Sequence, residues 1–454
     1  MDTKVCKFGG TSLSSATNIA KVRDIVFGDE TRRFVVVSAP GKRFSEDIKI
    51  TDMLYKCAEL ARNEGSCAKL FAVIRERFSE IVTNLKVDID INSILDETEK
   101  AIDKNKSDDF AASRGEYLSA RIIAKYFNFE FIDAEQFIKF DSNGRFDADY
   151  TNDLIEKRLA NVEKAVIPGF YGSMPGDVIK TFSRGGSDIS GSIVAKGVKA
   201  KIYENWTDVN GFYSADPRIV QNPLQIFCLG YHELRELSYM GASVLHAEAI
   251  FPVRDARIPI LIKNTFAPEK EGTMIIPDED YQGNGQTVTG IAGKKDFTVI
   301  TVEKSNMNAE IGFARKILSV LERYGISLEH MPSSIDTLSV VVNSNSLTGD
   351  LKDKVILRIR EAVDPDKVTV IDDVALIATV GHGMCKVKGT AGRLFSAISR
   401  GNVNILMIDQ GSSEKNIIVA VRNADYSKTI KAIYLEFLAH HELRFASDGG
   451  SDQT

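Results

Sequence analysis

Two glycine-containing loops hold the residues whose types and spacing could do chemistry. One loop lies between a β-branched run and a small-residue helical pattern and has the sequence Arg184-Gly185-Gly186-Ser187-Asp188. Amides at the start of a helix can point at an anion, and an arginine adds a two-pronged donor. The same residues also suit a plain strand-to-helix connection capped by Ser187 or Asp188. This loop alone does not decide between the two interpretations.

The second loop follows Lys7, which stands just before Phe8, Gly9 and Gly10. A lysine beside amides that cradle phosphate acts as a point charge for the β- and γ-phosphates of a nucleotide. The spacing is not that of a Walker A loop. Together, the two loops favour phosphoryl chemistry, with Lys7 and the amides of Gly9 and Gly10 as candidate phosphate contacts.

Two further stretches add polar side chains. Glu116 lies in a helical pattern with Ala112 and Ala120 one turn away on either side, which would let backbone or ligand come close. A glutamate on a helix is nevertheless more often a solvated surface residue. The turn-rich stretch 206–218 contains the only tryptophan together with Thr207, Asp208, Tyr213 and Arg218. Loops at strand ends are where α/β proteins bind ligands, so this stretch is a second candidate contact region.

The composition is that of a globular protein without a nucleic-acid footprint. The 454 residues are 43% hydrophobic and 26% charged, and the formal net charge is −6. Five scattered cysteines without a CxxC pair predict free thiols in a reducing compartment. The N-terminal residues lack the apolar segment of a signal peptide, and no run approaches the ~20 apolar residues of a membrane span. The six histidines lack metal-ligand spacing. We therefore expect a cytoplasmic protein without a metal site, a nucleic-acid partner or a membrane partner.

The elements that must position these loops alternate between strand and helix. Strands are predicted at 3–8, 34–40, 129–138, 165–170, 200–205 and 259–262. Helices are predicted within 53–86, around Glu116, at 150–164 and from Met240 to Ala249. Thr51 and Asp52 are expected to cap the helix that begins near Met53. This order predicts an α/β fold with a mainly parallel sheet.

A stretch rich in Gly, Pro, Asp and Gln, from Glu269 to Gly290, marks the predicted domain boundary. Beyond it the pattern repeats. The first copy has strands at Val299–Glu303, Ile326–Met331 and Leu338–Val342 and helices at Phe313–Tyr324 and Leu351–Ala362. The second copy has strands at Ala375–Val380, Val403–Ile408 and Ile417–Val421 and helices at Ala391–Arg400 and Ser427–Leu438. This repeat predicts two small α+β modules of ferredoxin-like type.

The chain resembles the aspartate kinases of the amino acid kinase family nearly from end to end. The segments that carry the resemblance are Lys7–Ser12, Arg184–Asp188, Trp206–Gly211, Asp216–Arg218 and Gly241–His246. The paired C-terminal modules resemble the family's tandem ACT domains, which sense amino acids. The resemblance implies a catalytic domain at 1–283 and ACT domains at 296–370 and 374–440, as in the monofunctional members without a fused homoserine dehydrogenase.

This resemblance implies ATP-dependent phosphorylation of the β-carboxylate of L-aspartate to 4-phospho-L-aspartate, the entry step to lysine, threonine and methionine. ATP with Mg²⁺ would be a co-substrate, and no tightly bound cofactor is implied. Lys7 and Asp188 are the implied catalytic residues. Aspartate contacts are implied for Ser38, Thr51, Glu116, Arg184, Gly185, Gly186 and Ser187. Nucleotide contacts are implied for Lys7, Gly9, Gly10, Thr207, Asp208, Tyr213, Arg218, Ser243 and Val244.

Feedback inhibition through the first ACT domain is also implied. The residues that match effector-site positions of lysine-sensitive relatives are Met307, Phe313, Ser327, Leu328, Glu329 and Ser334. The implied effector site also includes Glu310, Ala314 and Ile335. Ala309 and Ile335 stand where some relatives have polar residues. Lysine is the expected inhibitor, with threonine, alone or jointly, as the alternative. Ser243 and Ala247 stand where relatives carry lysine and proline. Paired sensor modules imply a homodimer or a dimer of dimers.

Two other functions stay open at this point. A glutamate 5-kinase or acetylglutamate kinase would use the same loops but would leave residues 297–438 unexplained. A catalytically inactive amino-acid sensor on the same scaffold would have no need to keep four charged groups beside the glycine loops. Those groups are Lys7, Glu116, Arg184 and Asp188.

Overall fold

The computed structural model describes residues 2–183, 185–242, 244–245 and 247–439. The chain divides into two compact units. The first comprises Met1–Phe212, Ile226–Leu234 and Ser243–Tyr281. The second comprises Tyr213–Gln225, Arg235–Ala242 and Gln282–Thr454, so two short segments from the earlier part of the sequence belong to it.

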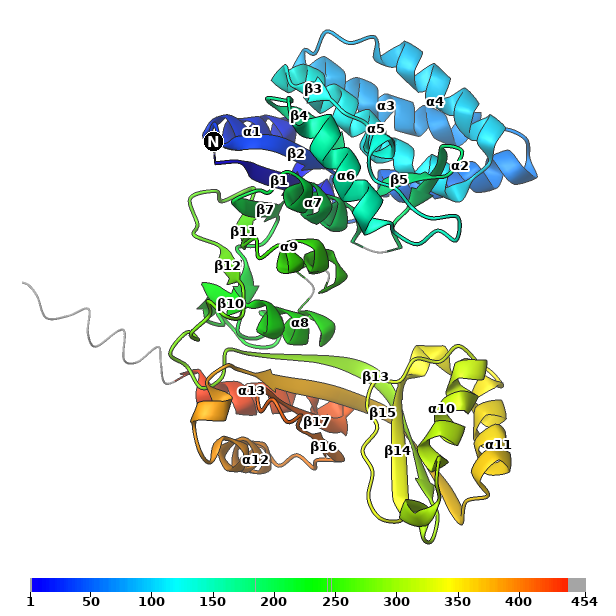
Figure 1. The fold of residues 1–454 in the computed structure, drawn as a ribbon, viewed down its shortest axis with the longest axis vertical. Helices are drawn as coiled ribbons and strands as arrows, with labels where there is room; N and C mark the ends of the chain where they lie inside the picture. The colour runs from blue at the N-terminus through cyan, green and yellow to red at the C-terminus, as the bar shows by residue number, and fades with distance from the viewer. Residues whose placement is uncertain (1, 184, 243, 246, 440–454) are drawn as a thin grey trace, which may run out of the picture. The chain divides into compact units, whose positions relative to one another are not determined.

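An eight-stranded sheet forms the centre of the first unit, in the order β10-β12-β11-β7-β1-β2-β4-β3 (Figure 1). Its strands are β1 (Lys4–Phe8), β2 (Arg32–Val37), β3 (Glu130–Phe131), β4 (Ala165–Pro168), β7 (Ile202–Thr207), β10 (Cys228–Gly230), β11 (Ile260–Asn264) and β12 (Thr273–Ile276). All neighbouring pairs run parallel except β11 and β12. The predicted α/β fold with a mainly parallel sheet is confirmed. A separate hairpin joins β5 (Tyr171–Met174) to β6 (Val178–Thr181).

Helices cover both faces of this sheet. They are α1 (Ala16–Phe27), α2 (Ile50–Asn63), α3 (Ala68–Leu85), α4 (Ile91–Asn105), α5 (Asp108–Phe127), α6 (Ala148–Leu159), α7 (Gly186–Gly197) and α9 (Phe251–Asp255). Helix α8 (Tyr231–Tyr239) begins in the first unit and ends in the second. Apolar side chains of α1 to α5 form one core with Cys6 and Phe8 of β1. Helix α7 packs across β1, β2 and β7. Across the described part of the chain, no helix is long and apolar enough to cross a membrane.

Two helix predictions need correction. Helix α2 begins at Ile50 with Lys49 at its N-cap, so Thr51 and Asp52 lie inside the first turn and do not cap it. The helix predicted from Met240 to Ala249 is not present among the described residues of that range, because α8 ends at Tyr239 and Gly241 adopts a positive φ of 111°. That left-handed conformation suits glycine and stops an α-helix.

The second unit is built on one five-stranded antiparallel sheet in the order β14-β13-β15-β17-β16. Its strands are β13 (Gly290–Glu303), β14 (Thr337–Asn343), β15 (Lys367–Val380), β16 (Met407–Asp409) and β17 (Asn416–Arg422). The two long strands β13 and β15 pair along nearly their whole length. Each predicted module therefore uses one half of β13 and one half of β15, and the two modules share a continuous sheet.

Each half of this sheet has its own core and its own pair of helices. The helices are α10 (Phe313–Arg323), α11 (Leu351–Val363), α12 (Thr390–Arg400) and α13 (Tyr426–Phe437). Side chains of α10 and α11 pack with β13 and β14, and side chains of α12 and α13 pack with β15 and β17. The internal repeat predicted from the sequence is present in the packing.

Two predicted strands of the repeat are shorter than expected. The segment predicted as a strand at Ile326–Met331 has only an isolated pairing, in which Glu329 N–H donates to Val341 and Val341 N–H donates to His330. Pro332 follows directly and has no N–H to extend the ladder. The strand predicted at Val403–Ile408 is reduced to β16 (Met407–Asp409).

Helix α7 supplies a test of how tightly the first unit is packed. A Cβ at Gly191 would lie 2.6 Å from Tyr203 Oη and 2.7 Å from its Cε2, and Tyr203 is fully buried. Alanine normally stabilises a helix interior by about 1 kcal/mol over glycine, but overpacking a core costs roughly 1–3 kcal/mol. We therefore expect Gly191→Ala to lower the free energy of unfolding of the first unit by about 1–2 kcal/mol in denaturant titrations.

The matched control is Gly392→Ala in α12, where no described atom lies within 4 Å of the added methyl group. There the helix preference acts alone, so a gain of up to about 1 kcal/mol is expected. Equal stabilisation by both substitutions would contradict the close packing of α7 on β7.

Candidate active site

A buried ion pair lies near the carboxyl end of the parallel strands. Lys7 Nζ of β1 is 2.5 Å from Asp188 Oδ1, and Asn205 of the neighbouring strand β7 donates to the same oxygen at 2.9 Å. Lys7 and Asp188 are 8% and 9% exposed. Lys7 alternates along β1 with Cys6 and Phe8, whose side chains enter the core on the other face. The ligand sites of open α/β sheets lie at this end of the strands.

The start of α7 explains why the carboxylate is held there. Gly185 precedes the helix in the left-handed conformation, with φ of 57°, and Asp188 lies in the first turn. A carboxylate in the first turn interacts favourably with the positive end of the helix dipole. Tyr203 Oη donates to the backbone carbonyl of Asp188 at 3.0 Å. The sequence predicts that this loop binds an anion, and in the structure its own Asp188 carboxylate pairs with Lys7.

The glycine turn after β1 packs against the end of β2. Gly9 N–H donates to the carbonyl of Trp206, and Gly41 N–H donates to the carbonyl of Gly10 at 2.8 Å. A Cβ at Gly10 would lie 2.9 Å from the carbonyl oxygen of Ala39, which leaves no room for a side chain. A Cβ at Gly9 would lie 3.5 Å from Lys7 Nζ. The ammonium group therefore lies beside the turn, as the sequence predicts.

Glu116 of α5 is the second buried acid of the site. It is 5% exposed, and the neighbouring positions Ala112, Ser119 and Ala120 are buried as well. Burial raises the pKa of this carboxyl to about 8, although a hydrogen bond from the Ala39 amide favours the carboxylate. Among the described residues, its Oε2 atom has no hydrogen-bond partner. An acid with one open acceptor position is suited to a positively charged donor.

Two other predicted aspartate contacts, Ser38 and Thr51, stand next in sequence to Ala39 and Ile50, which pack against α5 beside Glu116. Ser38 is half-buried and its N–H donates to Phe8, while Thr51 is half-buried in the first turn of α2. Gly115 lets Ala39 and Ile50 approach α5, because a Cβ there would lie 2.7 Å from the Ala39 side chain. The first unit thus brings together Lys7, Gly9, Gly10, Ser38, Thr51, Glu116 and Asp188. Arg184 lies outside the described residues.

The predicted nucleotide contacts divide between the two units. Thr207 ends β7 and hydrogen-bonds the Asp208 carboxylate at 3.3 Å, and Val244 is half-buried, all in the first unit. Tyr213 and Arg218 belong to the second unit. The Arg218 side chain is 87% exposed and pairs with Asp216 at 2.6 Å. Ser243 lies outside the described residues.

The predicted effector residues fall into three environments in the second unit. Met307 and Phe313 are buried in the core of the first module, and Ala314 is partly buried against it. Glu310 forms ion pairs with Lys304 at 2.8 Å and Lys316 at 2.6 Å, which lower its pKa. Glu329 accepts a hydrogen bond from Tyr239 Oη at 2.6 Å. The exposed members are Ser327, Leu328, Ser334 and Ile335.

Asn205 and the amide of Ala39 were not predicted as site residues. Asn205 is 2% exposed and stands in register with Lys7 on the adjacent strand. A side-chain amide between the large apolar residues Tyr203 and Trp206 of a predicted inner strand was the available signal, because a buried amide needs a partner. The Ala39 amide could not be anticipated, since it depends on how α5 packs against the end of β2. No group of three or more His, Cys, Asp or Glu side chains suited to a metal ion occurs in the described ranges.

Comparison with known proteins agrees with this geometry. A model of the amino acid kinase family matches residues 2–264, more than half of the chain, and an ACT domain model matches residues 377–437. Aspartokinase 3 of Bacillus subtilis (strain 168) is 41% identical over 455 residues, which cover 96% of this chain and 99% of the relative. A chloroplastic bifunctional aspartokinase/homoserine dehydrogenase 2 of Arabidopsis thaliana is 30% identical, covering 95% of this chain and 50% of the relative.

Solved structures that resemble this chain are also aspartate kinases. The crystal structure of Clostridium acetobutylicum aspartate kinase, an allosteric enzyme, has a TM-score of 0.90 and 52% identity, covering 96% of this chain and 100% of that chain. Escherichia coli aspartokinase III in complex with aspartate and ADP shares the fold, with a TM-score of 0.77 and 24% identity over 96% of this chain and 99% of that chain. This chain therefore belongs to the amino acid kinase family and, within it, to the aspartate kinases that carry ACT domains.

Proposed function

We propose that this aspartate kinase transfers the γ-phosphoryl group of ATP to the β-carboxylate of L-aspartate and releases 4-phospho-L-aspartate and ADP. The observation that carries the proposal is the buried ammonium of Lys7, 2.5 Å from Asp188 and beside the glycine turn. The product is the activated acid that opens the route to lysine, threonine and methionine. A catalytic domain at 1–283 with ACT domains at 296–370 and 374–440 would carry out catalysis and regulation.

The chemistry needs charge neutralisation more than proton transfer. A β-carboxylate with an ordinary pKa of ~3.9 is ionised at neutral pH and needs no strong base. The barrier is the approach of this anion to a polyphosphate, so catalysis comes from positioning and electrostatic stabilisation. Lys7 would neutralise the oxygens of the transferring phosphoryl group, assisted by the amides of Gly9 and Gly10 and by Mg²⁺ that arrives on ATP.

Asp188 has two proposed tasks in this scheme. In the absence of substrate it compensates the charge of Lys7, so the ammonium is not buried alone. When ATP arrives, the phosphates compete for Lys7, and Asp188 becomes available to the ammonium of aspartate. Asn205 holds the carboxylate in place during this exchange, because it donates to the oxygen that faces Lys7.

Aspartate recognition would use residues of opposite charge for the two charged groups on its α-carbon. Glu116 would bind the α-ammonium through the oxygen that lacks a described partner. Arg184 would bind the α-carboxylate in a bidentate manner, which leaves the β-carboxylate as the nucleophile. Ser38, Thr51 and the amides of Gly185, Gly186 and Ser187 would complete the aspartate site. Thr207, Asp208, Tyr213, Arg218, Ser243 and Val244 would hold the nucleotide.

We also propose feedback inhibition by L-lysine at the first ACT domain. E. coli aspartokinase III has been solved in complex with lysine and aspartate in a T-state, and it shares the fold of this chain at 23% identity. In this chain the predicted effector residue Glu329 contacts Tyr239, the last residue of α8. The predicted nucleotide residue Val244 comes five residues after Tyr239 in the sequence. An ammonium group that captured Glu329 would release Tyr239 at the end of α8.

The remaining parts of the proposal concern assembly and location. Large apolar side chains at Ile311 and Ile335 of the first ACT module are 97% and 66% exposed, which supports a homodimer or a dimer of dimers through ACT domains. All five cysteines are free thiols, which supports a reducing, cytoplasmic location.

The catalytic proposal is tested by Lys7→Ala. Removal of a charge that acts on the transition state lowers kcat by about 10²–10³-fold, while the KM for aspartate changes little, in a coupled assay of ADP release. Lys201→Ala is the control, because the Lys201 side chain is 62% exposed and pairs with Asp2 at the surface. Equal losses in kcat and in aspartate affinity would show that Lys7 only positions the substrate.

The pH dependence of aspartate binding tests the role of Glu116. Its pKa is raised to about 8, so most of the population is protonated at pH 7 and a binding-competent carboxylate accumulates as pH rises. The KM for aspartate should therefore fall up to about tenfold per pH unit from pH ~6 to ~8 and then level off. Calorimetry in two buffers should show proton release on binding at pH ~7. Glu116→Gln should raise this KM and abolish its pH dependence, whereas a flat profile in the unmodified enzyme would contradict the assignment.

Effector coupling is tested by Tyr239→Phe. Burial and the hydrogen bond to Glu329 raise the pKa of Tyr239 to about 12, so the phenol remains a donor that competes with an incoming ammonium group. Loss of this competitor should lower the half-inhibitory lysine concentration by about 3- to 10-fold. Glu329→Gln should shift it in the opposite direction. Unchanged inhibition in both variants would remove Glu329 from the effector site.

A further inference from the structure

A loop of residues 41–48 lies between β2 and α2. It follows Ser38 and Ala39 and precedes Thr51, so it connects two stretches that contain predicted aspartate contacts. At its start, Gly41 donates its N–H to the carbonyl of Gly10, and a Cβ at Gly41 would lie 2.7 Å from the carbonyl carbon of Gly10. The position of this loop therefore sets how closely the glycine turn and the Ser38–Ala39 segment meet.

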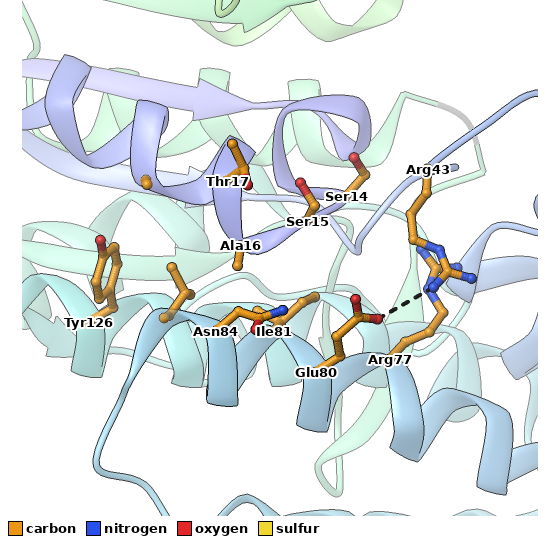
Figure 2. Close-up of a pocket in the computed structure, with 12 residues that line it drawn as sticks. Ser14, Ser15, Ala16, Thr17, Arg43, Arg77, Glu80, Ile81, Asn84 and Tyr126 are labelled. Carbon is orange, nitrogen blue, oxygen red and sulfur yellow. Dashed lines mark ion pairs between the residues drawn. The ribbon is translucent and has the colours of Figure 1, made fainter.

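One arginine on α3 holds both ends of this loop. Arg77 Nη2 donates to the carbonyl of Gly41 at 2.7 Å, and Nη1 donates to the carbonyl of Ile48 at 2.8 Å. The same guanidinium lies 3.6 Å from the Asp47 carboxylate. Arg77 is 3% exposed, so these contacts are shielded from solvent. Figure 2 shows Arg77 and Glu80 on α3, with Arg43 of the loop facing them and paired to Glu80.

The residue type at position 77 is not explained by core packing. Its neighbours on the buried side of α3, Ile74, Phe78 and Ile81, are apolar members of the core. A guanidinium at such a position carries a desolvation cost that only well-placed acceptors offset. Two carbonyls seven residues apart supply those acceptors, and they fix the loop in a way that an apolar side chain could not.

The contacts lead from Arg77 to the substrate side of the site. Ala39, two residues before Gly41, packs against α5 beside Glu116, since a Cβ at Gly115 would lie 2.7 Å from the Ala39 side chain, and its backbone amide favours the Glu116 carboxylate. Gly10, whose carbonyl accepts a hydrogen bond from Gly41, belongs to the glycine turn beside Lys7. A shift of the loop would therefore move the Ala39 amide and the Gly10 backbone together. Misplacement of reacting groups by about 1 Å can cost roughly 10²-fold in rate.

We propose that Arg77 is a positioning residue for phosphoryl transfer, which clamps the loop 41–48 so that the Ala39 amide and the Gly10 turn stay aligned with Glu116 and Lys7. This inference rests on the proposed roles of Glu116 and Lys7 in the reaction. Arg77 touches no substrate; it acts through backbone carbonyls.

The test compares Arg77→Lys and Arg77→Ala with Arg75→Ala on the same helix. Arg75 is the matched control because its guanidinium pairs with Asp96 and Glu99 of α4 and not with a described residue of the loop. The Arg77 variants are expected to lose at least ~10-fold in kcat and to raise the KM for aspartate, whereas Arg75→Ala retains both values. A cavity of about 460 Å³ between α1 and α3 borders Arg77. Millimolar guanidinium chloride, but not sodium chloride, should restore part of the activity of Arg77→Ala through this opening.

A second readout separates positioning from a general loss of stability. Loss of the Ala39 hydrogen bond disfavours the Glu116 carboxylate, so the pH midpoint of the aspartate KM should move upward in Arg77→Lys and stay in place in Arg75→Ala. Folded Arg77 variants with unchanged kcat, KM and midpoint would overturn the proposal. If neither Arg77 variant folds, Asp47→Asn is tested instead, because this substitution weakens the contact between Arg77 and the loop from the loop side. An altered pH midpoint of the aspartate KM then supports the proposal, and unchanged kinetics overturn it. A normal aspartate KM in Glu116→Gln would instead refute the site assignment on which the inference rests.

Discussion

The buried contact between Lys7 and Asp188 is the constraint on which the rest of the first unit depends. An ammonium and a carboxylate this far from water are tolerated only with mutual compensation and further hydrogen bonds, which Asn205 supplies. Replacing such a pair with apolar residues is often neutral or stabilising, so its presence argues for function rather than stability. The Lys7–Asp188 pair forms only if β1 and β7 are in register and if α7 begins directly after Gly185. The parallel sheet and the small residues of α7 meet those requirements.

The chemistry follows from how charges are distributed around that pair. One cation lies beside the glycine turn, and two buried acids lie where the amino acid is proposed to bind. Phosphoryl transfer between two anions gains from such a preorganised arrangement, because little reorganisation is needed when the substrates arrive. The raised pKa of Glu116 comes from its burial, which disfavours the carboxylate near neutral pH and which a nearby cation would offset.

Much of the fold and several site residues could be predicted from the sequence because they depend on local patterns. The apolar run before Ser38, the glycine turn after Lys7 and the internal repeat of the C-terminal part each have a period or spacing that indicates their structure. The helix expected at Met240–Ala249 was wrong, because a single positive φ at Gly241 outweighs the apolar periodicity. The contacts of Arg77 and of the Ala39 amide could not be predicted, since they join residues distant in sequence and depend on tertiary packing. The shared strands β13 and β15 were missed for the same reason.

The most direct test of the central claim is the identity of the phosphorylated group. Incubation of the full chain with ATP, L-aspartate and hydroxylamine converts an acyl phosphate into a hydroxamate, which mass spectrometry can locate on the amino acid. The account predicts aspartate-dependent formation of the β-hydroxamate in step with ADP release, because Arg184 and Glu116 hold the α-groups and leave the β-carboxylate free. An α-hydroxamate, or ADP release without any aspartate hydroxamate, would contradict it.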